Sequence, residues 1–247
     1  MDTKYKMLAL DMDGTLLTSN QTISPDTSKW IQRAKDEGVH VCLSTGRGFE
    51  SALPYGEELG LSTPMITVNG SEVWRAPHEL HQRSLMDPQL ISDMRAIALA
   101  EDCWYWAYSV DKVYNKDVWT DSIEEKEWLK FGFHTEDDEA RHRILMQLQE
   151  MGGLEITNSS PHNLEINPQG INKASGIRTV CGLLGLEMNE VIAVGDSMND
   201  LAAIQAAGVG VAMGNAQEVV REAADYVTSS NDRDGIAEVI RKFIFQM

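Results

Sequence analysis

Short apolar runs alternate with amphipathic segments over the first third of the chain. The runs at residues 5–11, 39–44 and 65–68 predict strands, and the segments at 24–37 and 49–59 predict helices between them. A Ser-Pro pair opens the first of these helices, which is typical of a helix N-terminus. A rhythm of strand, helix and strand predicts a parallel sheet with right-handed crossovers. Functional groups are then expected at the carboxyl ends of the strands.

The pattern changes in the middle of the chain, where strands and helices no longer alternate regularly. Residues 104–108 alternate like a strand and concentrate aromatic side chains. Such a run faces the core of a sheet more often than it offers a platform to a substrate, and both alternatives stay open here. The other elements expected in this part are a hairpin around 75–77, helices at 87–102 and 137–151, and a strand at 112–115.

The last third of the chain returns to the alternation of strand and helix. Residues 164–166 are expected to lead back to the first sheet, and 191–194 form another apolar strand. The whole pattern predicts an α/β fold with a doubly wound parallel sheet and a separate inserted domain. The expected limits are 1–83 and 163–247 for the core, and 84–162 for an α/β insertion.

Composition and charge narrow the class of protein. The 247 residues are 43% hydrophobic and 24% charged, which is typical of a globular chain. The formal net charge of −17 would repel a nucleic acid or an anionic membrane, so neither is expected as a partner. No apolar stretch approaches the ~20 residues that span a bilayer. The N-terminus leads directly into the first strand without a signal peptide, so a cytoplasmic location is expected.

Two carboxylates follow the first predicted strand. Asp11 and Asp13 are one residue apart, and residues i and i+2 of a strand project to the same side. They could act as nucleophile and proton donor, bind one hard cation, or belong to an ordinary turn, since Asp and Gly are common turn formers. Gly14 allows the backbone to turn sharply at this point.

Three further motifs stand at other strand ends and helix starts. Thr45, Gly46 and Arg47 follow the second strand, and Lys173 lies at the start of a predicted helix. Another acidic loop, Gly-Asp-Ser-Met-Asn-Asp, follows the strand at 191–194. Four such motifs, in this order on this rhythm of elements, are improbable as a coincidence.

Together these motifs resemble those of the haloacid dehalogenase-like phosphatases. The core signature is Asp-x-Asp-Gly-Thr, Thr-Gly-Arg, a separate Lys and Gly-Asp-x-x-Asn-Asp. Asn69-Gly70 and the segment from Gly208 to Asn215 resemble the Cof-type branch of that family, which carries a large α/β cap. The resemblance implies that the insertion at 84–162 is a cap that selects the substrate.

The resemblance also implies roles for the acidic residues. Asp11 would be the nucleophile, and Asp13 would protonate the leaving group and then activate water. Mg²⁺ would be held by the Asp11 carboxylate, the Asp13 backbone carbonyl and Asp196. Asp200 is expected to orient the metal shell rather than bind the ion first-hand, and it could also cap a helix.

The remaining motif residues would neutralise and position the phosphate. Thr45 would donate its hydroxyl, Gly46 a backbone N–H and Asn199 its side chain, while Lys173 would neutralise the charge shared between phosphate and nucleophile. Arg47 could face the substrate or close a helix turn, and the sequence does not decide between the two.

The function expected is therefore a Mg²⁺-dependent phosphatase that acts on small phosphorylated metabolites through an aspartyl-phosphate intermediate. Sugar phosphates and phosphomonoesters such as flavin mononucleotide or pyridoxal phosphate are plausible by family analogy alone. The alternatives are a phosphomutase of the capped type and a non-catalytic sugar-phosphate sensor. Nothing in the sequence specifies an oligomeric state.

Overall fold

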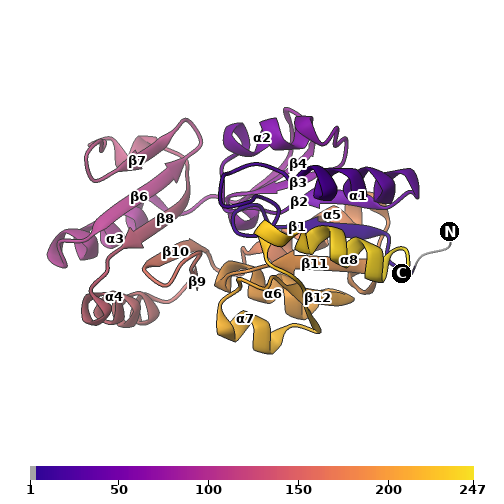
Figure 1. Ribbon diagram of the computed structural model, residues 1–247. Helices are drawn as coiled ribbons and strands as arrows, with labels where there is room; N and C mark the ends of the chain where they lie inside the picture. The colour runs from indigo at the N-terminus through magenta and orange to yellow at the C-terminus, as the bar shows by residue number, and fades with distance from the viewer. Residues whose placement is uncertain (1–3) are drawn as a thin grey trace. The chain divides into compact units, whose positions relative to one another are not determined.

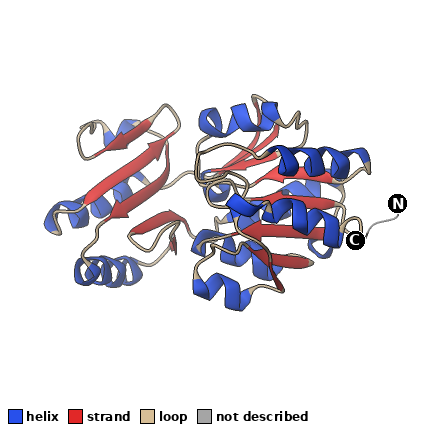
Figure 2. Cartoon of the chain, in the orientation of Figure 1, coloured by secondary structure: helices blue, strands red, loops and turns tan. Residues whose placement is uncertain are grey.

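The chain folds into two compact units. The computed structural model describes residues 4–247; the first three residues of the predicted core lie outside the described part. One unit, the core domain, is formed by the chain up to Gln82 together with Lys173–Met247. The other, the inserted domain, is formed by Arg83–Asn172. Helices and strands occur in both, as Figure 2 shows.

The core domain is built on a parallel sheet. Its strand order is β13-β12-β11-β1-β2, and every pairing in it is parallel. In register, Leu10 of β1 lies between Val194 of β11 and Leu43 of β2, so these three strands end at one level. The strands are β1 (Met7–Leu10), β2 (His40–Leu43), β11 (Val191–Gly195), β12 (Val209–Ala212) and β13 (Tyr226–Val227).

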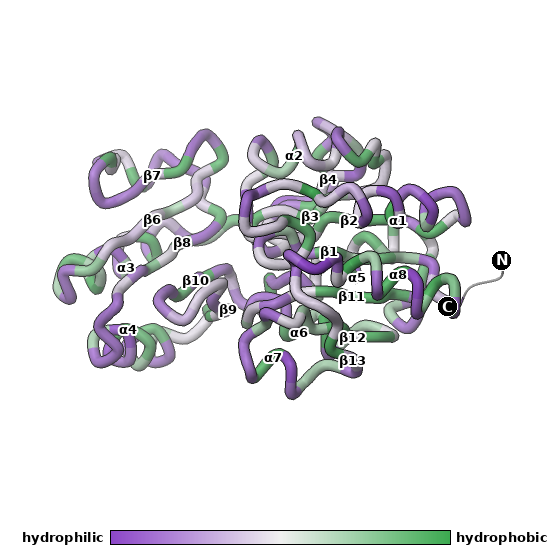
Figure 3. The backbone as a smooth tube through the Cα atoms, in the orientation of Figure 1, coloured by the Kyte–Doolittle hydropathy of each residue, from purple (hydrophilic) through white to green (hydrophobic). Residues whose placement is uncertain are grey.

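Alternate residues of β1 explain why helices cover both faces of this sheet. Leu8 and Leu10 belong to one apolar cluster, whereas Met7 and Ala9 belong to another. Strands buried on both faces read as continuous apolar runs, and Figure 3 shows this hydrophobic character along β11 and β12. The covering helices are α1 (Pro25–Asp36), α2 (Phe49–Glu58), α5 (Lys173–Leu184), α6 (Met198–Ala206), α7 (Glu218–Ala223) and α8 (Gly235–Phe243).

A small antiparallel sheet adjoins β2. It consists of β3 (Met65–Thr67), β4 (Glu72–Ala76) and β5 (Glu79–Arg83). Ser44, directly after β2, forms a parallel bridge with Ile66, and the Thr45 N–H donates to the Ile66 carbonyl. The predicted third strand therefore continues the parallel order by a single bridge and then turns into a hairpin.

The inserted domain has its own antiparallel sheet, with two helices against one face. The order is β7-β6-β8-β10-β9, and α3 contacts β6 and β8 while α4 contacts β9 and β10. Figure 1 labels these elements. They are α3 (Pro88–Ala100), β6 (Trp104–Ser109), β7 (Val113–Asn115), β8 (Trp128–His134), α4 (Asp138–Met151), β9 (Leu154–Thr157) and β10 (Asn163–Pro168).

One expected boundary differs from the structure. Residues 164–166 were expected to lead back to the core sheet, but they lie in β10, which pairs with β8 and β9. The chain leaves the inserted domain only after Asn172. The apolar alternation of β10 does not reveal which sheet it joins, because strand pairing is a tertiary choice.

Candidate active site

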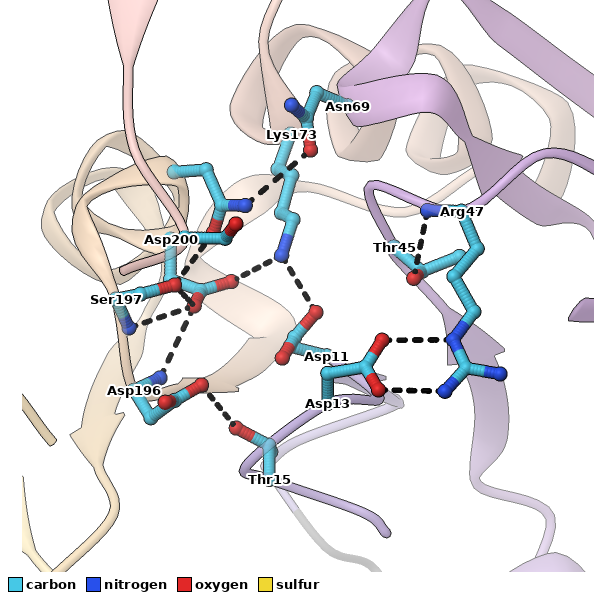
Figure 4. Close-up of polar contacts among 12 residues, drawn as sticks. Asp11, Asp13, Thr15, Thr45, Arg47, Asn69, Lys173, Asp196, Ser197 and Asp200 are labelled. Atoms are coloured by element: carbon cyan, nitrogen blue, oxygen red, sulfur yellow. Dashed lines mark hydrogen bonds and ion pairs between the residues drawn. The ribbon is translucent and has the colours of Figure 1, made fainter. Parts of the chain in front are cut away.

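Asp11 and Lys173 form a buried ion pair at the carboxyl edge of the core sheet. Asp11 directly follows β1, and Lys173 is the first residue of α5. The Lys173 Nζ donates to Asp11 Oδ1 at 2.6 Å and to Asp200 Oδ1 at 2.7 Å (Figure 4). The Lys173 side chain is 1% exposed and that of Asp11 7%. A charge buried so completely needs such partners.

Three carboxylates meet beside this lysine. Oxygen atoms of Asp11, Asp196 and Asp200 lie within 4.8 Å of one another. Asp196 follows β11, whose end is level with that of β1, so the sheet register brings the first two together. Hard carboxylate oxygens are the ligands that Mg²⁺ prefers, so the donor set fits this ion.

Asp200 also caps the N-terminus of α6. Its Oδ2 accepts hydrogen bonds from the backbone N–H groups of Asp196 at 3.0 Å and Ser197 at 3.1 Å. Its other oxygen is held by Lys173. The expectation of a helix-capping role is therefore confirmed. This geometry ties the start of α6 to the acidic cluster.

Burial and crowding shift the pKa values of these groups. Burial raises the pKa of Asp11 to about 7 against the lowering effect of Lys173. Burial, followed by the charges of Asp11 and Asp200, raises the pKa of Asp196 to about 8. Burial alone would lower the pKa of Lys173, but the two carboxylates that it contacts outweigh burial and raise it. One ammonium group thus faces three acidic groups, a balance that favours an added cation.

Arg47 binds both oxygens of the Asp13 carboxylate. Its Nε and Nη2 donate to the two Asp13 oxygens at 2.7 and 2.5 Å, and the Asp13 side chain is half exposed. The hydrogen bond to Asp13 is the main cause of the raised pKa of Arg47. The Asp13 carboxylate is not among the three clustered ones. The predicted metal contact of Asp13 is through its backbone carbonyl and stays a prediction.

The remaining predicted residues lie at neighbouring strand and helix ends. Thr45 is buried, and its Oγ1 accepts from the backbone N–H of Arg47 at 3.1 Å, with Gly46 between them. Asn199, in the first turn of α6, accepts from Ser197 Oγ at 3.0 Å and donates to Asn69 Oδ1 at 3.4 Å. The phosphate-binding roles of these residues stay predictions.

Ser197, Thr15 and Asn69 contact the predicted site residues, although the sequence predicted no role for them. Thr15 donates to Asp196 Oδ1 at 3.2 Å. Asn69 adopts a left-handed conformation, with φ 57°, and presents its side chain to Asn199. The Thr after Asp-x-Asp-Gly and the Asn-Gly pair after the third strand were visible in the sequence. Their partners were not, because each lies far away along the chain.

Gly14 is required by its surroundings. Its φ is +76°, and an added Cβ would lie 2.5 Å from Asp196 Oδ2. An L side chain here would meet both backbone strain and a clash. The glycine therefore allows the loop after Asp13 to approach the acidic cluster.

A doubly wound sheet that gathers three carboxylates and a lysine at its carboxyl edge defines a hydrolase-type site for phosphate chemistry. The sequence profile of the haloacid dehalogenase-like hydrolases matches residues 8–143 and 115–240. The chain belongs to this family. Among the helices of residues 4–247, none has the length and apolar character needed to cross a membrane.

Individual relatives agree with this assignment. The chain is 45% identical to the 5-amino-6-(5-phospho-D-ribitylamino)uracil phosphatase YcsE of Bacillus subtilis, over 98% of this chain and 97% of that protein. It is 31% identical to YitU of the same organism, which bears the same enzyme name, over 98% and 99%. A solved haloacid dehalogenase-like hydrolase from B. subtilis has the same fold, with a TM-score of 0.87 and 24% identity over 96% and 99%.

Proposed function

We propose that this protein is a Mg²⁺-dependent phosphatase that forms an aspartyl-phosphate on Asp11. The observation that carries the proposal is the placement of the Asp11 carboxylate, buried against Lys173 and next to Asp196 and Asp200. A carboxylate nucleophile divides a difficult hydrolysis into two easier displacements. The proposal therefore assigns attack on phosphorus to Asp11 and transfer of the phosphoryl group from Asp11 to water in a second step.

The Asp11 and Asp196 carboxylates and the Asp13 backbone carbonyl would hold Mg²⁺, which supplies positive charge to balance the incoming phosphate. Asp200 would orient this shell, because both of its oxygens already accept hydrogen bonds. Lys173 neutralises the charge shared between the phosphate and Asp11. Its buried position strengthens this effect, because electrostatic interactions are larger where water is excluded. Thr45 and Asn199 would donate hydrogen bonds to the phosphoryl oxygens, as would the Gly46 N–H.

Asp13 would transfer the protons. It gives a proton to the leaving alcohol and later takes one from the attacking water, work that typically contributes ~10²–10⁴-fold. The two hydrogen bonds from the Arg47 guanidinium hold the Asp13 carboxylate in one orientation. The sequence left open whether Arg47 faces the substrate or closes a helix turn, and this contact supports neither role. It supports a role in placing Asp13.

We further propose that the inserted domain recognises the organic part of the substrate. The apolar cluster of the inserted domain packs on the sheet face that α3 and α4 contact. In register, Trp106 pairs with Gly132, which pairs with Glu165, and these residues lie in one row across β6, β8 and β10. Of the aromatic run 104–108, Tyr105 belongs to the apolar core whereas Trp104, Trp106 and Tyr108 alternate with it. The core-facing alternative thus holds for Tyr105, and we assign the substrate platform to the face that carries Trp106 and Tyr108.

The chemistry of this face suits a flat, hydrogen-bonding group. An added Cβ on Gly132 would overlap the indole of Trp106, so the ring packs directly against Gly132. The Lys130 Nζ lies 4.8 Å from the Tyr108 ring centroid and 3.2 Å from Glu165 Oε2. Aromatic rings beside a charge pair favour a planar heterocycle. The uracil phosphatase named above, at 45% identity, supports a pyrimidine bearing a phosphorylated side chain as the substrate class.

The decisive experiment measures phosphate release from a panel of compounds with Mg²⁺ and with chelator. The panel contains a phosphoribitylamino-pyrimidine, flavin mononucleotide, pyridoxal phosphate and a hexose phosphate. We expect Mg²⁺-dependent release that Asp11→Asn abolishes and that the exposed-site control Asp121→Asn retains. Release that survives Asp11→Asn would contradict the nucleophile. Absence of release from every compound would favour the phosphomutase or sensor alternatives.

The recognition proposal has its own test. Trp106→Ala should raise KM for the pyrimidine phosphate about tenfold, which corresponds to the ~1–1.5 kcal/mol of an aromatic stack. The KM for glycerol 2-phosphate, which has no ring, should stay within about twofold. Equal changes for both substrates would show that Trp106 does not read the organic group.

A further inference from the structure

Three side chains from the last part of the chain hold the loop that follows Asp13. Asn215 lies after β12, and Asn231 and Asp232 lie in a short 3₁₀ turn, Asn231–Arg233. We call Asn215, Asn231 and Asp232 the C-terminal clasp. Each of them contacts the loop at a different point between residues 14 and 19.

Asn215 is the central member of the clasp. Its Nδ2 donates to the Gly14 carbonyl at 2.8 Å, and its Oδ1 accepts from the Asn231 backbone N–H at 3.0 Å. Reversing this amide would place oxygen against oxygen and N–H against N–H, so the two contacts define its orientation. Asn215 thus bridges two loops that lie 201 residues and 16 residues from it in sequence.

Asn231 and Asp232 bind the loop after Asp13 at two further residues, Leu17 and Ser19. Asn231 Nδ2 donates to the Leu17 carbonyl at 2.8 Å. Asp232 accepts from the Ser19 backbone N–H at 2.8 Å and from its hydroxyl at 2.8 and 3.0 Å. The clasp therefore binds the loop at three residues, through the carbonyls of Gly14 and Leu17 and the backbone N–H of Ser19.

The core sheet explains why the clasp reaches this loop. β12 and β13 are parallel neighbours, and the Gly214 N–H donates to the Ser229 carbonyl beyond their ends. The loops after both strands therefore run together along the carboxyl edge of the sheet. The Gln217 N–H also donates to the Asp196 carbonyl at 2.9 Å. The segment that carries Asn215 is thereby tied to both acidic loops.

We propose that Asn215 and Asn231 are positioning residues that hold Asp13 in place for proton transfer; this inference rests on the proposed phosphatase function. Gly14, bound by Asn215, is the residue next to Asp13. Asp13 is half exposed on a loop with little regular structure, so its main chain needs external support. A proton donor must lie within hydrogen-bond reach of the leaving oxygen, and a 1 Å misplacement can cost about 10²-fold in rate.

The test compares two substrates that differ in their need for an acid. Glycerol 2-phosphate releases an alkoxide that must be protonated, whereas p-nitrophenyl phosphate releases a stable phenolate. Asn215→Ala should lower kcat/KM about tenfold or more for glycerol 2-phosphate and less than about threefold for p-nitrophenyl phosphate. Asn231→Ala should give the same selective loss, and the double variant should lose less than the product of the two.

The controls separate positioning from general damage. Asn20→Ala alters an exposed asparagine of the same loop that makes no hydrogen bond within residues 4–247, and it should leave both rates unchanged. Asn215→Asp keeps the shape but removes the donor, so it should reproduce the selective loss. Equal losses for both substrates, or none, would overturn the inference. A native chain that hydrolyses neither substrate with Mg²⁺ would instead overturn the proposed function.

Discussion

Lys173 and Asp11 lie 162 residues apart in sequence, yet their side chains meet at 2.6 Å in the interior. The same lysine also binds Asp200, so a single ammonium group joins the ends of β1 and the start of α6. Two carboxylates beside one buried ammonium leave a net negative site. This imbalance links the stability of the core domain to pH and to metal.

Lys173→Met should destabilise the protein by about 3–5 kcal/mol at about pH 8, because it leaves Asp11 and Asp200 buried without their counter-ion. Urea unfolding in chelator measures the loss. Lys29→Met, at an exposed position, serves as the matched control and should change the free energy of unfolding by less than about 0.5 kcal/mol. A loss no larger than in this control would contradict the charge argument.

The stability of the metal-free protein should depend on Asp196 and pH. The pKa of Asp196 is raised from 3.8 to about 8, so the folded chain binds this proton more tightly than the unfolded chain. The stabilisation is complete below the unfolded pKa and is lost as pH rises through the folded one. Asp196→Asn should therefore become steadily more stable than the native chain between about pH 4 and pH 8. Urea titrations across that interval test the trend; a constant difference would contradict it.

Mg²⁺ binding should strengthen as pH rises toward about 8. The ion must displace the protons that Asp11 and Asp196 retain because burial raises their pKa values. Calorimetry in buffers of different ionisation enthalpy would count the protons released. Activity lost on chelation should return when Mg²⁺ is restored. Affinity that is independent of pH would show that these carboxyls are not the ligands.

Gly14→Ala should weaken Mg²⁺ binding and activity far more than its strain alone explains. The added Cβ would press on Asp196 Oδ2. Gly38→Ala provides a matched control, because Gly38 also has a positive φ, +83°, but nothing lies within 4 Å of an added Cβ. Both should lose about 1–2 kcal/mol of stability through the left-handed backbone. Only Gly14→Ala should lose metal affinity, and an equal effect of both would exclude the contact with Asp196.

The buried ion pair of the inserted domain predicts that a second substitution will restore part of the stability that a first one removes. Lys130 and Glu165 are 2% and 7% exposed in their side chains. Lys130→Met alone should cost about 3–5 kcal/mol by stranding Glu165, whereas adding Glu165→Gln should recover part of that loss. Thermal unfolding of the single and double variants completes a double-mutant cycle. Additive losses would show that the two side chains are not coupled.

Much of the site could be predicted from local pattern. Asp11 and Asp196 each end an apolar run, and parallel strands end at one edge of a sheet, so their meeting was expected. The capping role of Asp200 also follows from its place at a helix start. The strand ends and the helix start depend on neighbours in sequence, and the general rule that parallel strands end at one edge then brings Asp11 and Asp196 together.

Other features depend on segments that are remote in sequence. Three contacts join distant parts of the chain. They are the pairing of β10 with the inserted sheet, the hydrogen bonds from Arg47 to Asp13, and the contact between Asn69 and Asn199. The clasp between Asn215 and Gly14 is of the same kind. The sequence by itself determined the strand ends, the acidic motifs and the family. Only the tertiary structure decided which distant side chains became partners, because hydrogen-bond geometry exists only once the elements have packed together.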